Sequence, residues 1–292
     1  MDKPIASPSH TKEILKKFGL HAKKGYGQNF LIDVSVVARC AKASFSEGAV
    51  IEIGPGIGSL TEQLALVSKH VRSYEVDEGL IPVLDDTLKN YSNVEIILQD
   101  FLECDLESSV KELKDKYGSV SVCANLPYYV TTPILFKIFE CKELIPYITV
   151  MVQKEVGDRF SAEVNSKDYS ALSVEAQYLY DVKRLFVVPR TAFNPAPNVD
   201  SAIIQFKRKE KLEPVEDINE FFDLVKASFK QRRKTIYNNL KEYTDSKELT
   251  DKILKNANIS PSVRAQELGQ KEFINLYKAY KEVLWKNVHT QK

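Results

Sequence analysis

The residues best suited to chemistry form a short run, Asn125-Leu126-Pro127-Tyr128, which follows an apolar segment. Residues 120–124 are β-branched or small and predict a buried strand. Pro127 cannot donate a ladder hydrogen bond and disfavours helix at the residue before it, so the strand ends at Asn125. A carboxamide, a main-chain carbonyl and an aromatic ring therefore project from one strand end, which is where ligands bind in open α/β sheets.

This combination suits the exocyclic amine of adenine, a poor nucleophile because its lone pair is delocalised into the ring. Two acceptors for its hydrogens, the Asn125 side-chain oxygen and a main-chain carbonyl near Leu126, would help to free that lone pair. Tyr128 can hold the flat base by stacking. An ordinary strand followed by an Asn-x-Pro turn explains the same residues, since Asn and Pro are turn formers.

Three earlier predicted strands, residues 50–53, 71–77 and 94–100, also carry polar side chains near their ends. Glu52, Glu75, Asp100 and Asn125 follow one another at steps of 23, 25 and 25 residues. This step is the length of a βαβ unit. It predicts that the four side chains lie in register along one sheet edge and contact one ligand.

A glycine-rich turn, Gly54-Pro55-Gly56-Ile57-Gly58, joins the first of these strands to a helix that begins near Ser59 or Thr61. Glycines permit positive φ and let the backbone approach a ligand closely. The spacing is one residue tighter than the dinucleotide fingerprint. Glu75 lies 21 residues after Gly54, the distance at which an acid reaches a ribose hydroxyl in doubly wound folds.

Further strands at 147–152, 182–188 and 202–206 complete a predicted α/β domain with a mostly parallel, seven-stranded sheet. Three prolines stiffen the loop between the last two strands and should hold Phe193 out of any regular element. Phe193 can then form the second side of a base sandwich with Tyr128. The alternative is that Phe193 packs into the core beneath the loop.

The two ends of the chain differ from this middle. Residues 1–8 are predicted to be disordered, Ser9 or Thr11 to cap a short helix that ends at Gly19, and Asp33 to cap a helix over 34–43. The glycine-containing loop 23–33 is either a connector or a loop that folds over a bound ligand. Beyond a boundary at 207/208 the periodicity is helical, which predicts a small all-α domain over 208–292. One of its helices should carry four positive charges, on Lys230, Arg232, Arg233 and Lys234.

Charge is distributed unevenly along the 292 residues. Residues 1–24 hold six lysines against two acids, residues 25–207 hold 17 basic and 25 acidic residues, and residues 208–292 hold 18 basic and 13 acidic residues. Basic ends around an acidic centre suit a protein that grips a polyanion with its periphery, although lysine-rich surfaces are also common. The sequence shows no membrane span and no signal peptide at its N-terminus. Four separated cysteines and four scattered histidines indicate buried free thiols and no metal site.

Taken together, these residues resemble the ribosomal RNA adenine dimethyltransferase family over nearly the whole chain. The resemblance rests on ordered motifs, which are residues 27–31 (Gly-Gln-Asn-Phe-Leu), 52–58 (Glu-Ile-Gly-Pro-Gly-Ile-Gly), 75–77 (Glu-Val-Asp), 100–101 (Asp-Phe), 125–128 (Asn-Leu-Pro-Tyr), 193–201 and 231–235 (Gln-Arg-Arg-Lys-Thr). Asn198 departs from the basic residue frequent at that position in the family, which puts one phosphate contact and hence RNA affinity in doubt.

The resemblance implies a Rossmann-like methyltransferase that uses S-adenosyl-L-methionine, releases S-adenosyl-L-homocysteine and needs no metal. It implies a cofactor-binding catalytic domain over 1–207, with 1–24 as a basic extension, and an RNA-binding domain over 208–292. Asn29 and Leu31 would close on the cofactor, Gly54 and Gly56 would pass beneath its methionine portion, and Glu75 and Asp100 would accept hydrogen bonds from its ribose and its adenine. Asn125, which touches both cofactor and target, Leu126, Tyr128 and Phe193 would form the catalytic set. The RNA would be held by Lys230, Arg232, Arg233 and Lys234.

The implied substrate is a pair of adjacent adenosines in the 3′-terminal hairpin of 16S rRNA, each dimethylated at N6 during biogenesis of the 30S subunit. We expect a cytoplasmic monomer. Three alternatives remain. They are the large-subunit rRNA methyltransferase of macrolide resistance, disfavoured by the proline-rich loop and the basic helix; an RNA-binding or transcription-factor homologue with reduced catalysis, disfavoured by the intact site; and an NAD-binding oxidoreductase, disfavoured by the glycine spacing and the lack of a proton donor.

Overall fold

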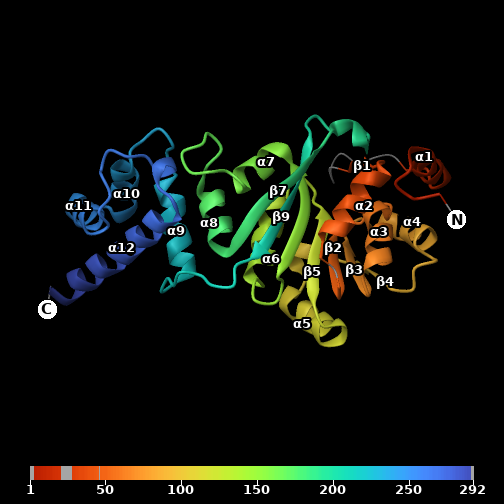
Figure 1. Ribbon diagram of the computed structural model, residues 1–292, viewed down its shortest axis with the longest axis horizontal. Helices are drawn as coiled ribbons and strands as arrows, with labels where there is room; N and C mark the ends of the chain where they lie inside the picture. Colours follow the sequence, from red (N-terminus) through yellow and green to blue (C-terminus); the bar gives the residue numbers. More distant parts are fainter. Residues whose placement is uncertain (1–2, 21–27, 46, 291–292) are drawn as a thin grey trace. The chain divides into compact units, whose positions relative to one another are not determined.

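A mostly parallel sheet is the framework of the described residues, which are 3–20, 28–45 and 47–290 of the computed structural model. Within them seven strands pair in the order β4-β3-β2-β5-β6-β9-β7 (Figure 1). The strands are β2 (Ala49–Ile53), β3 (His70–Glu75), β4 (Val94–Leu98), β5 (Val120–Asn125), β6 (Tyr147–Gln153), β7 (Tyr180–Val188) and β9 (Ser201–Arg208). β2 to β6 pair in parallel and β9 pairs antiparallel to β6. The expected sheet is confirmed.

The order of the strands reverses between β2 and β5. From β2 the chain adds β3 and β4 on one side, whereas β5 and β6 extend the sheet on the other. At such a switch point the loops leave the sheet in opposite directions and open a crevice at the carboxyl ends of the two central strands. The turn after β2 and the run after β5 both begin there.

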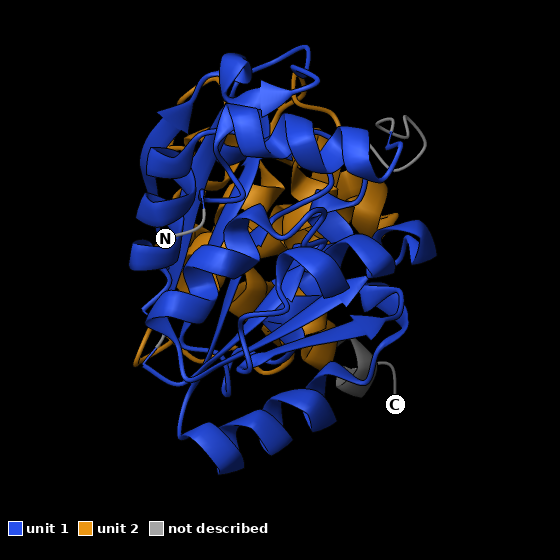
Figure 2. Ribbon diagram, turned by 90° about the vertical axis from the view of Figure 1, so that its right-hand side faces the viewer, with its two compact units in different colours: residues 1–157, 181–208 blue, residues 158–180, 209–292 orange. Residues whose placement is uncertain are grey.

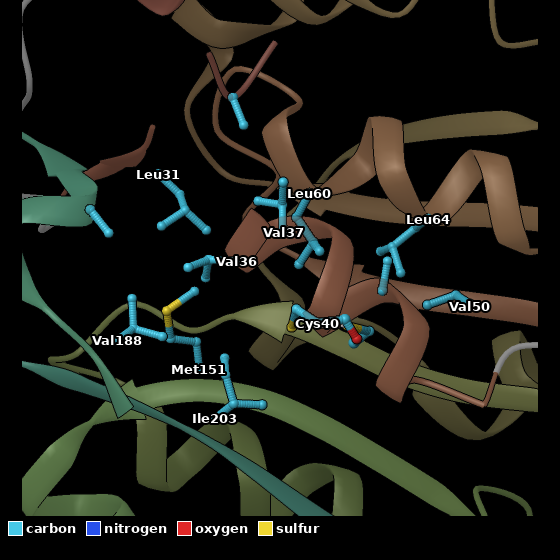
Figure 3. Close-up of a cluster of buried hydrophobic side chains, with 14 of the residues drawn as sticks. Leu31, Val36, Val37, Cys40, Val50, Leu60, Leu64, Met151, Val188 and Ile203 are labelled. Atoms are coloured by element: carbon cyan, nitrogen blue, oxygen red, sulfur yellow. Dashed lines mark hydrogen bonds between the residues drawn. The ribbon is translucent and has the colours of Figure 1, made fainter. Parts of the chain in front are cut away.

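One face of the sheet is covered by α2 (Val34–Ala43) and α3 (Ser59–Val67). Alternate strand residues point to this face, as the two-residue period requires. They form a buried apolar cluster with side chains of the two helices (Figure 3). The labelled members from the sheet are Val50, Met151, Val188 and Ile203, and those from the helices are Val36, Val37, Cys40, Leu60 and Leu64.

The opposite face is covered by α5 (Leu106–Tyr117) and α6 (Thr131–Glu140). Arg72 of β3 points to α5, where its Nη1 and Nη2 donate to Glu112 at 2.8 and 3.0 Å. Phe139 of α6 meets Phe206 of β9 edge to face at 5.5 Å between ring centroids. Helices on both faces explain why β2 is buried along its whole length and β5 is buried up to Asn125, its last residue.

The N-terminal segment is ordered, so the expectation of disorder over residues 1–8 is wrong for the described part. Helix α1 (Pro8–Lys17) begins after Ser7, not after Ser9 or Thr11. Ile5 is 2% exposed and its N–H donates to Glu62 Oε2 of α3 at 3.0 Å. Ile5 and Ile14 pack with apolar residues of α4 (Ile81–Thr87). Burial of these two isoleucines outweighs the Pro/Ser-rich composition that suggested disorder.

Helix α2 begins as the sequence predicts. The Asp33 carboxylate accepts hydrogen bonds from the backbone N–H groups of Ser35 and Val36, at 2.9 and 3.2 Å. These bonds and the hydroxyl of Ser35 lower the pKa of Asp33. The cap fixes the direction in which the chain leaves β1 (Phe30–Leu31), the short strand that precedes it.

A second compact unit is helical and has an aromatic core. It holds α8 (Ala171–Leu179), α9 (Ile218–Ser228), α10 (Ile236–Thr244), α11 (Lys247–Asn256) and α12 (Gln270–Thr290). Tyr178 of α8 contacts Phe221 of α9 at 5.1 Å, and Phe221 contacts Tyr277 of α12 at 5.7 Å between ring centroids. Aromatic pairs in these tilted and edge-on arrangements stabilise a small core beyond the area they bury.

The two units divide the chain differently from the expected 1–207 and 208–292. The first unit holds residues 1–157 and 181–208, and the second holds 158–180 and 209–292 (Figure 2). The segment 158–180 leaves the sheet within α7 (Lys154–Phe160) and packs on α9, where Tyr169 contacts Phe229 at 5.9 Å. It therefore belongs to the helical unit, although it lies between two strands of the sheet in sequence.

The basic run was expected on a helix, and this is wrong. Helix α9 ends at Ser228, and Thr235 caps α10 by accepting from the N–H of Asn238. The four basic residues therefore lie on the connection between two helices, and all four are exposed. The threonine at the end of the run is the local signal for the break, because threonine favours the N-cap over the interior of a helix.

Glu175 of α8 gives a test of how the helical unit is packed. Its side chain is 1% exposed, and neither carboxylate oxygen has a hydrogen-bond partner among the described residues. Burial raises its pKa from 4.5 to about 7. The folded state therefore keeps a proton that the unfolded chain has released, so the free energy of unfolding falls as the pH rises from 4.5 to 7.

We predict that Glu175→Met raises the free energy of unfolding by about 1–3 kcal/mol at pH 8, with a smaller gain at pH 5. Calorimetry of the full chain at the two pH values measures this. Glu210→Met, at an exposed acid, is the matched control and should change neither value. An equal gain at both pH values would contradict a buried, unpaired carboxylate.

Candidate active site

A cavity of about 290 Å³ opens where β2 and β5 end. All ten residues that the sequence assigns to cofactor or catalysis line it, and all belong to the first unit. They are Asn29, Leu31, Gly54, Gly56, Glu75, Asp100, Asn125, Leu126, Tyr128 and Phe193. The glycine turn and the Asn125 run thus share one space, as the predicted strand ends require.

The glycine turn adopts the backbone that the sequence predicts. Gly54, Gly56 and Gly58 have φ values of +69°, +62° and +91°. A Cβ atom built on Gly54 would meet only Pro127, at 3.9 Å, among the described atoms. Space is therefore left open beside the backbone of Gly54, as a ligand that lies against the turn would need.

Glu75, the last residue of β3, lies beside this turn and is 5% exposed. Its Oε1 accepts from the N–H groups of Val76 and Asp77 at 2.9 Å, and its Oε2 accepts from the N–H of Gly56 at 3.3 Å. Burial raises the pKa of Glu75, and the three backbone hydrogen bonds oppose that rise. The carboxylate is thereby fixed against the glycine turn.

Gln28 enters the same region from the segment before β1. Its Nε2 donates to Asp77 Oδ2 at 2.9 Å, and Asp77 caps the 3₁₀ turn η2 (Glu78–Leu80). The adjoining Asn29 and Leu31 line the cavity. Residues 23–27 of the loop that was expected to fold over a ligand lie outside the described residues.

Glu52 is the most deeply buried of the four polar residues that were expected in register along one sheet edge, all of which line the cavity. It is 1% exposed and accepts from the hydroxyls of Thr61 and Ser73, at 2.7 and 2.6 Å. Burial, above all, raises its pKa to about 7. Glu52 lines the inner wall of the cavity, one residue before the strand ends, and ties β2 to α3 and β3.

Asp100 is exposed and caps the 3₁₀ turn η3 (Phe101–Glu103) by accepting from the N–H of Leu102 at 2.8 Å. Lys137 of α6 donates to the carbonyl of the same Leu102 at 2.8 Å. No local sequence signal identifies Lys137, because it lies 35 residues further along the chain. It nevertheless fixes the turn that presents Asp100 to the cavity.

Two hydrogen bonds to neighbouring segments hold the backbone of the Asn125 run. The N–H of Leu126 donates to the carbonyl of Met151 at 3.0 Å, and the carbonyl of Pro127 accepts from the hydroxyl of Thr131 at 3.0 Å. Neither hydrogen bond occupies the carbonyl of Leu126, the second acceptor that the sequence predicts. The Asn125 side chain is half-buried at the cavity wall.

Phe193 lies in β8 (Phe193–Asn194), which pairs antiparallel with β1 so that Leu31 lies opposite Phe193. The expectation that the prolines hold Phe193 out of any regular element is therefore wrong. Phe193 is 3% exposed and packs with Leu31 and Met151 in the apolar cluster, while one side of it lines the cavity. Two-residue pairing between distant segments leaves no periodic pattern in the sequence.

The basic residues Lys230, Arg232, Arg233 and Lys234 belong to the second unit, and none of them lines the cavity. Arg232 is held by two neighbouring loops, because it donates to Gln266 Oε1 at 3.1 Å and to the carbonyl of Ser166 at 3.3 Å. Within the described residues, no helix is long and apolar enough to cross a membrane. No three His, Cys, Asp or Glu side chains of the described residues gather as metal ligands would.

Comparison with known proteins gives consistent matches. The model of the ribosomal RNA adenine dimethylase family matches residues 19–282. The ribosomal RNA small subunit methyltransferase A of Bacillus mycoides (strain KBAB4) is 48% identical in an alignment of 284 positions that covers 95% of this chain and 97% of that protein.

Two solved structures share the fold. A dimethyladenosine transferase from Plasmodium falciparum aligns with a TM-score of 0.72 at 24% identity, over 87% of this chain and 98% of that one. The 23S rRNA methyltransferase ErmE aligns with a TM-score of 0.67 at 24% identity, over 87% of this chain and 100% of that one.

We predict that Gly54→Ala weakens binding of S-adenosyl-L-homocysteine by at least about tenfold, because the added Cβ would enter the open space beside the turn, where we expect the ligand to lie, and because L-residues disfavour positive φ. Titration calorimetry measures the dissociation constant. Gly118→Ala is the matched control, since Gly118 also has a positive φ (+90°) and no atom within 4 Å of its added Cβ, but does not line the cavity. Equal affinity of the two variants would show that the ligand does not lie against the turn.

Proposed function

The chain belongs to the ribosomal RNA adenine dimethylase family, and we propose that it transfers methyl groups from S-adenosyl-L-methionine to two adjacent adenosines in the 3′-terminal hairpin of 16S rRNA. Each adenosine is dimethylated at N6. The observation that carries this proposal is the single cavity shared by the glycine turn, the Glu75 and Asp100 carboxylates and the Asn125 run. We further propose that the protein acts as a cytoplasmic monomer on an assembling 30S subunit.

The residues present fit the cofactor. The open space at Gly54 accommodates its methionine portion, Glu75 can accept from its ribose hydroxyls, and Asp100 can accept from its adenine amine. When bound, the cofactor supplies a methyl group that its sulfonium already activates. The lining holds three carboxylates and no lysine, arginine or histidine among the described residues, which suits a ligand with positive charge.

The target base is positioned by the run after β5. The Asn125 carboxamide oxygen and the Leu126 carbonyl accept hydrogen bonds from the N6 amine, and the Tyr128 ring stacks on the base. Fixing the amine in line with the methyl group supplies several kcal/mol, as pre-organised reactions of this kind do. The base must leave any helical stack to reach the cavity, which the aromatic surface favours. The methylated amine becomes acidic and loses its proton to water, so no strong base is required.

The sequence identity to a small-subunit methyltransferase favours the small-subunit substrate over the large-subunit one, because the likeness to the 23S enzyme extends to the fold alone. We predict that the purified protein transfers labelled methyl groups to unmethylated 30S subunits and that Asn125→Ala lowers the rate at least about 100-fold. Scintillation counting of the isolated RNA measures this. Fully methylated 30S and 50S subunits are the controls. Transfer to 50S RNA alone, or to neither particle, would refute the proposal.

The four basic residues of the second unit provide a separate test of RNA binding. We predict that replacing Lys230, Arg232, Arg233 and Lys234 by glutamine raises KM for the 30S particle by at least about tenfold, leaves kcat within about twofold and flattens the salt dependence of KM. The control replaces the three lysines of α11, at positions 247, 252 and 255, and Lys241 of α10 by glutamine, which removes the same number of charges from elsewhere in the same unit. A similar rise in KM for both variants would mean that only net charge matters.

A further inference from the structure

We propose that Ser201 is a positioning residue, whose hydroxyl holds the ring of Tyr128 in the orientation that stacks the target base for methyl transfer. The inference rests on the proposed function and deepens it. The Tyr128 and Ser201 hydroxyl oxygens lie 2.7 Å apart, although the residues are separated by 73 positions in sequence. Ser201 is fully buried, whereas Tyr128 is half-buried and lines the cavity.

Ser201 is fixed by the sheet. It is the first residue of β9 and pairs with Gln153, the last residue of β6. The preceding Asp200 is held twice, since its carbonyl accepts from the N–H of Lys154 and its Oδ1 accepts from the N–H of Arg190, each at 2.9 Å. The backbone at Ser201 is therefore held by two separate segments of the first unit, residues 153–154 and Arg190.

Tyr128, unlike Ser201, is not fixed by strand pairing. It lies in the turn between β5 and α6, outside any strand, and the turn's hydrogen bonds involve Pro127 and Val130. A tyrosine ring beside a cavity of about 290 Å³ can rotate about its side-chain torsions unless its far end is anchored. Burial raises the pKa of Tyr128, so the phenol keeps its proton and stays a donor at neutral pH. The hydrogen bond to Ser201 supplies that anchor.

This assignment explains why a serine follows the proline-rich loop. The loop ends at Asp200, and the first strand residue after it meets the ring on which the base would stack. Loss of the anchor would leave the ring in place and widen its range of orientations. Catalysis is sensitive to such misplacement, whereas the proposed cofactor contacts are made by other lining residues, Gly54, Glu75 and Asp100.

A double-mutant cycle on the full-length protein tests the inference. Tyr128→Phe removes the phenol hydroxyl and keeps the ring, and Ser201→Ala removes its partner. With unmethylated 30S subunits as substrate, each variant should lower kcat about three- to tenfold, the range that one net hydrogen bond corresponds to. The kcat of the double variant should be no lower than that of the less active single variant, because both changes break the same hydrogen bond. KM for the particle and the dissociation constant of S-adenosyl-L-homocysteine should stay within about twofold.

Thr149→Val is the matched control. Thr149 is a fully buried hydroxyl residue of β6 that donates to the carbonyl of Ala43 at 3.0 Å and does not line the cavity. It should lower the melting temperature about as much as Ser201→Ala without changing kcat. If Ser201→Ala does not fold, Tyr128→Phe alone decides, because it leaves Ser201 and the sheet intact.

Three results would overturn the inference while the wild-type protein remains active. They are a wild-type kcat in Ser201→Ala or Tyr128→Phe, a loss in the double variant equal to the product of the two single losses, and an equal loss of kcat in Thr149→Val. An inactive wild-type protein would instead overturn the proposed function. The two failures are therefore distinguishable.

Discussion

The parallel pairing of β2 with β5 is the constraint on which the site depends. The register sets Ala49 opposite Val120 and Ile51 opposite Val122. Continued to the strand ends, the same register sets Gly54 level with Asn125. A shift of one residue would turn each alternating side chain to the opposite face, so burial of Val50 and Cys123 beneath α2 and α3 also fixes this alignment. The core thereby places the glycine turn beside the Asn125 run.

Three acidic residues line the cavity at this junction, and they differ in how deeply they are buried. Glu52 is buried beneath the glycine turn, Glu75 is held against Gly56, and Asp100 is exposed at the rim. Burial is the first cause of the raised pKa of both glutamates, and the charge of Glu75 adds to the rise at Glu52. A positive charge on a ligand would lower these pKa values again and offset the cost of burying the two carboxylates.

Much of this arrangement could be predicted from the sequence. Asn125, Glu75 and the glycine turn are strand-end residues, and the βαβ step sets where successive strands end. The anchors between distant segments could not be predicted. Ser201 contacts Tyr128, and Lys137 contacts Leu102, each through a single hydrogen bond that leaves no local pattern in the sequence. Phe193 pairs through a strand of two residues, and segment 158–180 joins the helical unit through aromatic contacts that only the folded chain brings together. The Pro/Ser-rich composition also wrongly predicted disorder at the N-terminus, where the burial of Ile5 stabilises an ordered segment.

In the proposed reaction, an adenosine amine enters the cavity formed at the junction of β2 and β5, and every other step depends on this entry. Mass spectrometry of small-subunit rRNA from cells with and without the gene tests it most directly. We predict two adjacent N6,N6-dimethyladenosines in the 3′-terminal hairpin when the gene is present and unmodified adenosines when it is deleted. Identical modification in both strains, or a change confined to large-subunit RNA, would contradict it.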